Sequence, residues 1–341
     1  MIDLEKDYRP RYLSVSEMIC KYTKLSSIPD ILMIDGTGTP YKRTIRRMDE
    51  YLKAIDKQLV FNQGKNIFKE DADKPLSFVV ETITAVSNIN QIDREQEEVL
   101  IDHVTDKAIE EFCRMNQYYA FNTAAKNDLR NIYRDLLHNL RGNAHPLKSI
   151  EKNHYENLKQ WLQNTNPFAG VLYANAESEI NPVACAEYAA DLQFEVLHLD
   201  LETMMEPVLD IGCGREGNLV KYLNSVGIEA YGIDRFSFSD TFLLQADWLE
   251  YNYGTGKWGT ITSNLGFSNH FKHHHLRADG NYLEYGKKYM EILTSLKNGG
   301  SFHYAPDLPF IEQFLDSEKF RIKQYHIDAS DFKTSRITRI I

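Results

Sequence analysis

The sequence predicts an α/β domain in its C-terminal part, preceded by a mainly α-helical N-terminal half. Before residue 165, apolar residues recur at three- and four-residue steps, the period of amphipathic helices. After about residue 205, short β-branched and apolar runs alternate with helical segments, which is typical of a mostly parallel sheet covered on both faces. We therefore expect a helical domain over 1–165, a linker over 166–182 and an α/β domain over 183–341.

The N-terminal half carries the helical pattern in five places. The clearest helices lie within 96–122 and 127–140, and RGNAHP at 141–146 ends the second, because glycine and proline both interrupt helices. Shorter helices are expected over 45–59, 76–86 and 150–162. The segment after 163 is rich in turn formers, which predicts the linker, and one more helix over 182–199 leads into the α/β domain.

Seven short runs in the C-terminal part predict strands. They are 208–211, 230–233, 242–246, 260–263, 301–304, 320–326 and 335–341. The last two runs are separated by a short turn, which predicts a closing antiparallel hairpin.

Composition limits the function classes. The chain of 341 residues has a formal net charge of −10, which opposes binding to nucleic acid because such binding depends on cationic contacts. No apolar run approaches the ~20 residues that cross a bilayer. The start, MIDLEKDYRP, lacks the basic and apolar regions of an export signal, so a cytoplasmic location is expected. None of the four cysteines forms a CxxC pair, and oligomeric state is not predicted.

The most specific stretch is EPVLDIGCGREGNLVKYL at 206–223, which predicts a strand, a glycine turn and a helix. Gly212, Gly214 and Gly217 match GxGxxG, and Asp234 ends the next strand 22 residues after Gly212. A dinucleotide site has this pattern, so an NAD-dependent oxidoreductase is one candidate. However, Asp210 at the mouth of the strand would repel a pyrophosphate and attract an ammonium group.

Two later segments add to this pattern. QADW places Asp247 and Trp248 just after another strand, where a carboxylate and an aromatic ring suit an adenine pocket. LKNGGSFHYA at 296–305 gives a helix end, a glycine turn and a further strand. Together with VLDIGCGREG and YGID, these segments resemble the class I S-adenosylmethionine-dependent methyltransferases, over roughly 206–341. The third glycine departs from the family's usual GxGxG spacing.

The resemblance implies a Rossmann-like, seven-stranded, mostly parallel sheet with an antiparallel last strand, and S-adenosylmethionine as cofactor. Asp210, Gly212 and Gly214 would line its methionine and ribose part, Asp234 would hold the ribose hydroxyls, and Asp247 and Trp248 the adenine. Asn264 would face the methyl group. The full candidate cofactor set is Asp210, Gly212, Cys213, Gly214, Asp234, Arg235, Asp247, Trp248 and Asn264. The alternative for Asp234 and Asp247 is a helix cap or a loop carboxylate.

The segment after the fourth strand, SNLGFSNHF, bears on the methyl acceptor. Methylases of exocyclic base amines resemble it in the asparagine and the aromatic residue, but both of their prolines are missing here. An amine of a nucleobase is therefore not supported. His270, His273, His274 and His275 crowd what is expected to be a loop over the carboxyl ends of the strands.

Three interpretations of these histidines stay open. One histidine, best His270, is a general base for a hydroxyl or amine acceptor, with His303 in the fifth strand as a second catalytic candidate. Several, such as His270 and His274, bind a metal, although no metal is our main expectation. In the third interpretation, the histidine run is a solvated lid that takes no part in the chemistry. Candidate substrate contacts are Phe267, Tyr304, Asp307 and Tyr282.

These observations favour S-adenosylmethionine-dependent methyl transfer to a hydroxyl or amine of a small molecule. The expected acceptor is a biosynthetic intermediate, and no membrane or nucleic-acid partner is expected. A small-molecule acceptor fits because the long N-terminal half would cover the site. The alternatives are a non-catalytic cofactor-binding or partner module, the NAD-dependent oxidoreductase, and methylation of a protein partner.

Overall fold

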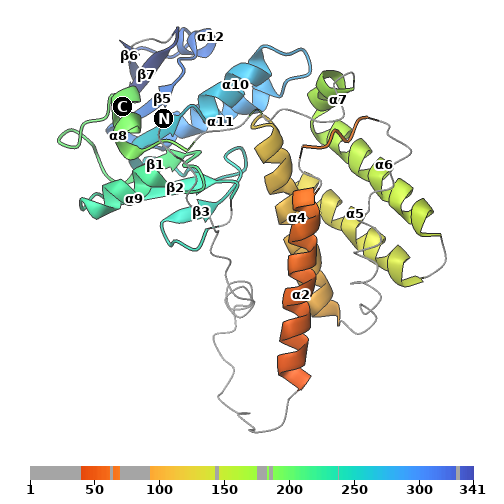
Figure 1. The fold of residues 1–341 in the computed structure, drawn as a ribbon. Coiled ribbons are helices and arrows are strands. Elements are labelled where there is room, and N and C mark those ends of the chain that lie inside the picture. The colour runs from red at the N-terminus through yellow and green to blue at the C-terminus, as the bar shows by residue number, and fades with distance from the viewer. Residues whose placement is uncertain are drawn as a thin grey trace, which may run out of the picture. The chain divides into compact units, whose positions relative to one another are not determined.

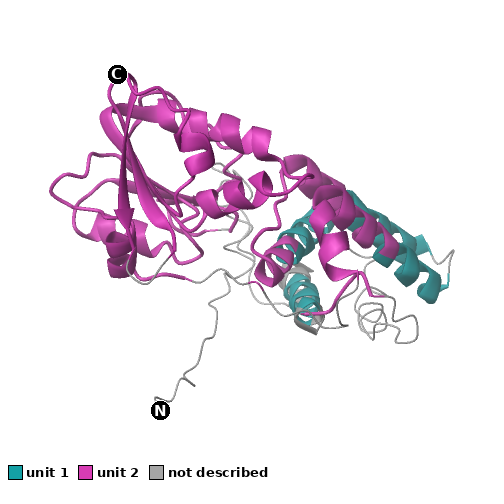
Figure 2. Cartoon of the chain, turned by 90° about the horizontal axis from the view of Figure 1, so that it is seen from above, with its two compact units in different colours: residues 1–63, 71–108, 130–155 teal, residues 64–70, 109–129, 156–341 magenta. Residues whose placement is uncertain are grey.

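The computed structural model describes residues 40–61, 64–69, 93–142, 146–174, 183, 187–236, 238–327 and 331–341 (Figure 1). The chain forms two compact units, coloured in Figure 2. The helical unit comprises 1–63, 71–108 and 130–155, and the sheet unit comprises 64–70, 109–129 and 156–341. The helix expected over 76–86, together with Cys20 and Cys185, lies outside the described residues.

The sheet unit contains a seven-stranded sheet with the order β3-β2-β1-β4-β5-β7-β6. The strands are β1 (Val208–Ile211), β2 (Ala230–Asp234), β3 (Leu243–Gln245), β4 (Trp258–Asn264), β5 (Leu296–Ala305), β6 (Phe320–His326) and β7 (Lys333–Arg339). β1 to β5 pair in parallel, whereas β7 runs antiparallel to both β5 and β6. The predicted strands and the antiparallel last strand are confirmed, and this is the class I methyltransferase fold.

The central strands are buried because helices cover both faces. β1 and β4 are buried along their whole length. On one face, α10 (Phe267–His275) and α11 (Tyr282–Ser295) pack on an aromatic core that includes Trp258, Tyr289 and Phe302. On the other, α8 (Ala190–Val196) and α9 (Asn218–Ser225) lie near a smaller core, and α12 (Pro309–Glu312) follows β5.

Three expectations about local structure need correction or comment. The histidine-rich segment is helix α10 rather than a loop, because its apolar residues Phe267 and Phe271 are four apart and both buried. The helix expected over 182–199 is described only as α8, seven residues long. Inside the segment expected to be a linker, α7 spans Pro167–Tyr173.

The N-terminal part of the described chain is helical, as the periodicity predicts. The helices are α2 (Pro40–Phe61), α4 (Arg94–Met115), α5 (Thr123–Gly142) and α6 (Leu147–Thr165). In the helical unit, Met48, Tyr51 and Leu52 of α2 pack with Leu100 of α4. None of the described helices is long and apolar enough to span a membrane.

Candidate functional site

The glycine turn joins β1 to α9 and leaves the backbone open to a ligand. Gly212, Gly214 and Gly217 have φ angles of +77°, +74° and +58°, a region that side chains with a Cβ rarely adopt. A Cβ at Gly212 would lie 3.1 Å from the Trp248 ring. The turn therefore requires glycine both for its backbone angles and for the close approach of its neighbours.

Asp234 ends β2 and supports this turn. One carboxylate oxygen accepts a hydrogen bond from the Gly214 N–H at 2.9 Å, and the other accepts from the Arg235 N–H at 2.7 Å. Burial raises the pKa of this carboxyl group, whereas Arg235 and the two N–H groups lower it. Each oxygen keeps a second acceptor site, so the carboxylate can also bind a ribose hydroxyl.

Asp210, in β1, is almost completely buried and only half satisfied. Its Oδ1 accepts a hydrogen bond from the Thr262 hydroxyl at 2.8 Å, and its Oδ2 has no partner among the described residues. Burial raises its pKa to about 7, the Thr262 hydrogen bond lowers it, and the Asp234 charge raises it.

Asn264, at the end of β4, has an entirely unsatisfied side chain. Its amide oxygen and nitrogen are buried, and within the described part of the chain neither has a hydrogen-bond partner. β4 pairs directly with β1, so these atoms and Asp210 Oδ2 belong to neighbouring strands. A buried polar atom without a partner costs roughly 1–3 kcal/mol, so these orphan atoms indicate a place where a ligand supplies the partners.

Trp248 closes the site from the other side. Its ring lies over Gly212, contacts the Phe267 ring at a centroid distance of 6.2 Å, and meets His270 edge-on at 4.8 Å. The neighbouring Asp247 accepts a hydrogen bond from the Leu249 N–H at 2.8 Å, the loop role that the sequence left open beside adenine binding. Burial raises the pKa of Asp247.

A second wall comes from residues 109–129, which belong to the same unit. The Arg235 guanidinium donates to the carbonyl oxygens of Tyr119 at 3.0 Å and Gln117 at 3.3 Å. The pocket between this wall and the strand ends has a volume of about 50 Å³. Its lining consists of Ile109, Cys113, Tyr119, Ala120, Phe121, Lys126, Asp234, Arg235, Ala246, Asp247, Trp248 and His270.

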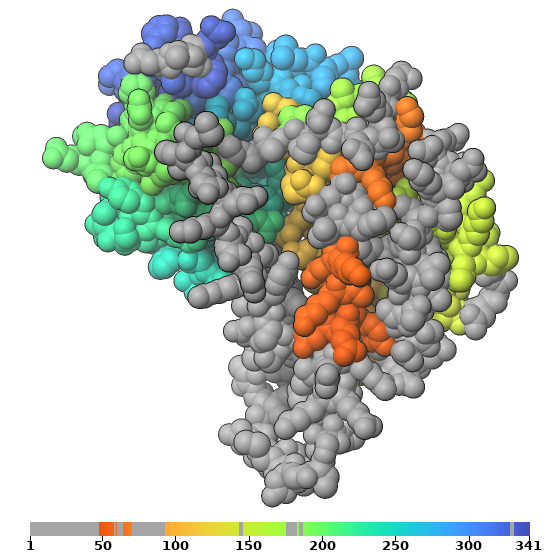
Figure 3. All heavy atoms as spheres, viewed as in Figure 1, coloured from red at the N-terminus to blue at the C-terminus, as the bar shows by residue number. Residues whose placement is uncertain are grey.

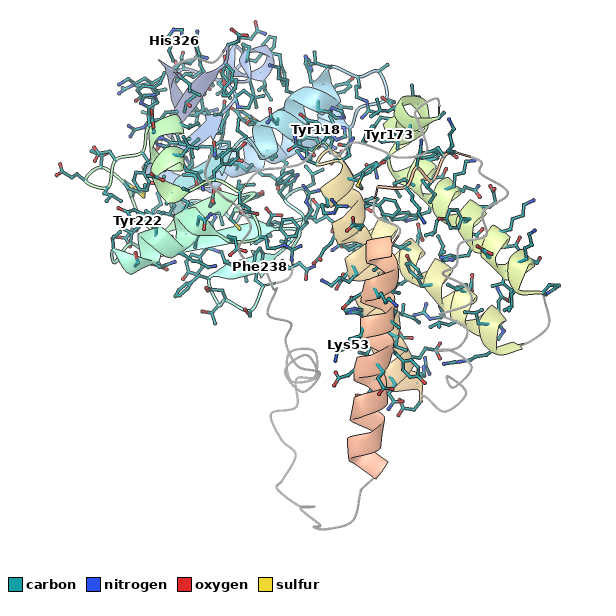
Figure 4. The ribbon with its side chains drawn as sticks, in the orientation of Figure 1. Lys53, Tyr118, Tyr173, Tyr222, Phe238 and His326 are labelled. Carbon is teal, nitrogen blue, oxygen red and sulfur yellow. The ribbon has the colours of Figure 1, made fainter. Side chains whose placement is uncertain are left out.

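The four histidines of α10 have different surroundings. His270 is 3% exposed and lies against Tyr118, which Figure 4 labels, and Trp248. His273 stacks on Tyr118 at 4.2 Å, His274 on Tyr285 at 4.8 Å, and His275 on Phe310 at 3.8 Å. The four rings therefore point to different neighbours, and of these four histidines His270 alone lines the pocket. The described residues contain no group of three or more His, Cys, Asp or Glu arranged to hold a metal ion.

His270 is held as a neutral imidazole. Burial lowers its pKa well below the ordinary value, Arg235, His274 and His273 lower it further, and a hydrogen bond to the Gln117 backbone raises it. Its Nδ1 lies 3.5 Å from the Tyr285 hydroxyl. A neutral imidazole has one ring nitrogen that can accept a proton.

Five further candidates do not line this pocket. His303 lines a second pocket, described below. Tyr304 is fully buried in the aromatic core, where its hydroxyl donates to Glu312 at 2.6 Å. Asp307 accepts a hydrogen bond from the Lys333 N–H at 3.0 Å, and Tyr282 is 45% exposed at the start of α11. Phe267 is fully buried and touches the site only through Trp248.

Other site features were not anticipated from the sequence. Glu187 accepts a hydrogen bond from the Arg215 N–H at 2.8 Å and lies against Gly214. Cys213, by contrast, was among the candidate cofactor residues; it is buried inside the turn and packs in the smaller core. The pair Tyr118–Tyr119 follows the end of α4, and its only sequence signal was an aromatic run after a long helix.

No protein-family model matches the sequence, and neither does any curated protein. Several solved structures that resemble it are methyltransferases. A TehB-like S-adenosylmethionine-dependent methyltransferase from Corynebacterium glutamicum is 16% identical, covers 55% of this chain and 99% of its own, and has a TM-score of 0.31. The N-methyltransferase NodS from Bradyrhizobium japonicum is 12% identical over 44% and 96%, with a TM-score of 0.31.

The antibiotic-resistance methyltransferase Kmr is 14% identical over 47% of this chain and 96% of its own, with a TM-score of 0.29. At such scores the likeness carries no argument about substrate or mechanism. The assignment to the class I methyltransferase fold rests on the strand order and the antiparallel β7.

Proposed function

We propose that this protein transfers a methyl group from S-adenosylmethionine to a hydroxyl or amine of a small molecule. The observation that carries the proposal is the cluster of orphan polar atoms at the ends of β1 and β4, Asp210 Oδ2 and both Asn264 amide atoms, beside the glycine turn. A buried carboxylate at this position suits an ammonium group and opposes a pyrophosphate.

The chemical types of the residues at the site suit the parts of this cofactor. Asp210 would accept from its ammonium group and Asp234 from its ribose hydroxyls, while the turn at Gly212 and Gly214 leaves room for close approach. Asp247 and Trp248 would hold the adenine. The pocket of about 50 Å³ is smaller than the ~300 Å³ typical of ligand sites, so the Trp248 side chain has to move away from Gly212 when the cofactor enters.

When bound, the cofactor supplies an electrophilic methyl group on a sulfonium with a good leaving group. The chain then has to align the acceptor, exclude water and remove a proton where necessary. His270 is placed for proton removal, because its neutral ring lines the pocket. Its contact with the Gln117 backbone fixes the ring, and Tyr118 and Trp248 shield it from water.

Calorimetric titration with S-adenosylhomocysteine, with NAD as the parallel ligand, tests the cofactor. We expect binding of the first and none of the second. Asp234→Ala should abolish binding, whereas Asp240→Ala should retain it, because Asp240 also accepts a backbone hydrogen bond, from Phe242, but does not line the pocket. Binding of NAD alone would replace this proposal with an oxidoreductase.

A panel of hydroxyl- and amine-bearing small molecules, assayed with methyl-labelled cofactor, tests the reaction. Once an acceptor is found, His270→Ala should lower kcat by roughly 100-fold or more while S-adenosylhomocysteine binding persists. His275→Ala is the matched control on the same helix, because its ring stacks outside the pocket. Equal rates for His270→Ala and wild type would remove the histidine base from the proposal.

A further inference from the structure

A second and larger pocket lies on the face of the sheet that carries α8. Its volume is about 620 Å³, within the ~300–1,000 Å³ range of small-molecule sites. It is lined by Phe194, Glu195, His198, Leu199, Asp200, Thr203, Met204, Thr260, Ser301, His303, Tyr325 and Arg336. It shares no lining residue with the smaller pocket beside Trp248 and His270. In Figure 3 the green atoms around α8 lie directly beside the dark-blue atoms of the last strands.

A polar row that crosses the sheet contributes His303 and Arg336 to the lining of this pocket. Thr262 of β4, His303 of β5 and Arg336 of β7 are successive partners in register, so their side chains share one face. His303 is satisfied at both ring nitrogens, by the Leu197 carbonyl at 3.0 Å and the Ser301 hydroxyl at 2.9 Å. Burial lowers the pKa of His303 to about 4, so this ring is neutral at pH 7.

Arg336 is the cation of the row. Among the described residues, its buried Nε has no hydrogen-bond partner and no ion pair includes Arg336. Guanidinium groups in partly buried positions are normally matched by a carboxylate, which they bind with two parallel hydrogen bonds. Lys323, its partner in register on β6, adds a second positive charge above the Tyr325 ring at 4.8 Å.

Two carboxylates at the rim do not provide this match. Glu195 and Asp200 are both exposed, where charge interactions are weak because water screens them. The Asp200 oxygens accept from the Glu202 N–H at 3.0 Å and the Thr203 hydroxyl at 3.3 Å. With Arg336 and Lys323, these two rim carboxylates bring the formal charge around the pocket to zero, which disfavours a doubly charged phosphate relative to a singly charged anion.

The wall opposite the polar row is apolar. Phe194, Leu199 and Met204 line it, and the His198 ring stacks on Tyr325 at 4.3 Å. We propose that this pocket binds a small organic monocarboxylate, with the carboxylate at Arg336 and an apolar body between Phe194, Leu199 and Met204. This site is independent of the proposed methyl transfer, so either proposal can fail without the other.

Hexanoate is a suitable probe, with hexylamine as the charge-reversed control. In protein labelled with ¹³C at its methionine methyls, hexanoate should shift the Met204 signal saturably and leave Met290, on α11, unchanged. Hexylamine should produce no such shift. No saturable Met204 shift with millimolar hexanoate, or equal binding of hexylamine, would overturn the proposal.

Arg336→Gln tests the contact itself. It should weaken hexanoate binding by at least roughly tenfold, because a charge-assisted hydrogen-bond pair is lost. Arg321→Gln, on the neighbouring strand and outside the lining, makes the same change in net charge and should leave binding nearly unchanged. If both variants bound hexanoate equally weakly, the loss would follow from net charge alone, and the proposed site would be refuted. The methionine spectrum without ligand reports whether each variant is folded, and the hexylamine comparison stands if Arg336→Gln does not fold.

Discussion

At the scale of single residues, two glycines allow the cost of a strained backbone to be distinguished from the loss of space for a ligand. Gly212 and Gly227 both have positive φ angles, +77° and +89°, but only at Gly212 would a Cβ meet other atoms. We expect Gly227→Ala to cost about 1–2 kcal/mol of unfolding free energy and to leave S-adenosylhomocysteine binding intact.

Gly212→Ala should cost at least as much and should also weaken that binding, since the methyl group displaces Trp248 and fills the approach to the turn. Chemical denaturation and calorimetric titration of both variants provide the two measurements. Unchanged ligand affinity in Gly212→Ala would show that the ligand does not approach this residue.

If Asp210 binds the ammonium group as proposed, we expect ligand binding to depend on pH. Its folded-state pKa of about 7 means that it becomes ionised as pH rises through neutrality, and an ammonium-bearing ligand prefers the ionised form. S-adenosylhomocysteine should therefore bind more tightly as pH rises from about 6 to about 8.

Asp210→Asn keeps the shape but removes the charge, so it should bind roughly tenfold more weakly at the upper pH and show little pH dependence. Asp240→Asn, outside the pocket, should retain the wild-type profile. A wild-type affinity that is constant over this range would contradict the assigned role of Asp210.

At the scale of elements, helix α6 carries a buried histidine that should make the protein sensitive to acid. His154 is 5% exposed, its Nδ1 has no hydrogen-bond partner among the described residues, and its ring lies 5.3 Å from Tyr133. Burial lowers its pKa to about 4. The unfolded chain, with a histidine pKa near 6.5, therefore binds more protons between pH ~6.5 and ~4, and stability falls as pH falls through this window.

His154→Phe should remove up to roughly 3 kcal/mol of this acid-induced loss, by ~1.4 kcal/mol per pKa unit. His138→Phe, at an exposed position of α5, should leave the pH dependence as in wild type. Urea unfolding at a series of pH values measures both. A His154→Phe profile parallel to wild type would show that another group controls the acid response.

Elements also show where sequence patterns succeed and fail. β1, β2 and β4 were predictable because buried parallel strands read as continuous apolar runs. Helix α10 was missed because four histidines among nine residues obscure its apolar period, although Phe267 and Phe271 carry it. His303 was expected to face the acceptor, but strand alternation places it with Ser301 on the α8 face, while Phe302 and Tyr304 face the aromatic core.

At the scale of the whole molecule, the fold was largely predictable and the site only in part. The predictable site residues lie in or beside the glycine turn, such as Asp210, Gly212 and Asp234. They lie together because the carboxyl ends of parallel strands share one edge of the sheet. The wall formed by Tyr118 and Tyr119 depends on a tertiary contact with Arg235, more than 100 positions away along the chain, and no local pattern encodes such a contact.

Net charge leads to a prediction for the whole chain. With −10 at neutral pH, the protein should not shift short DNA or RNA duplexes or single strands in gels, even at low salt. Binding that weakens steeply with added salt would reveal a local basic surface and would reopen nucleic acid as a methyl acceptor.

The position of Trp248 should also allow tryptophan fluorescence to report ligand binding. Of the three tryptophans, Trp161 and Trp258 are buried, and each donates its indole N–H to a carbonyl oxygen at 2.9 Å. Trp248 is only partly buried, over the glycine turn. A change in tryptophan emission on addition of a ligand should therefore report the displacement of this one indole, and an emission change lost in Trp248→Phe would time the opening of the site directly.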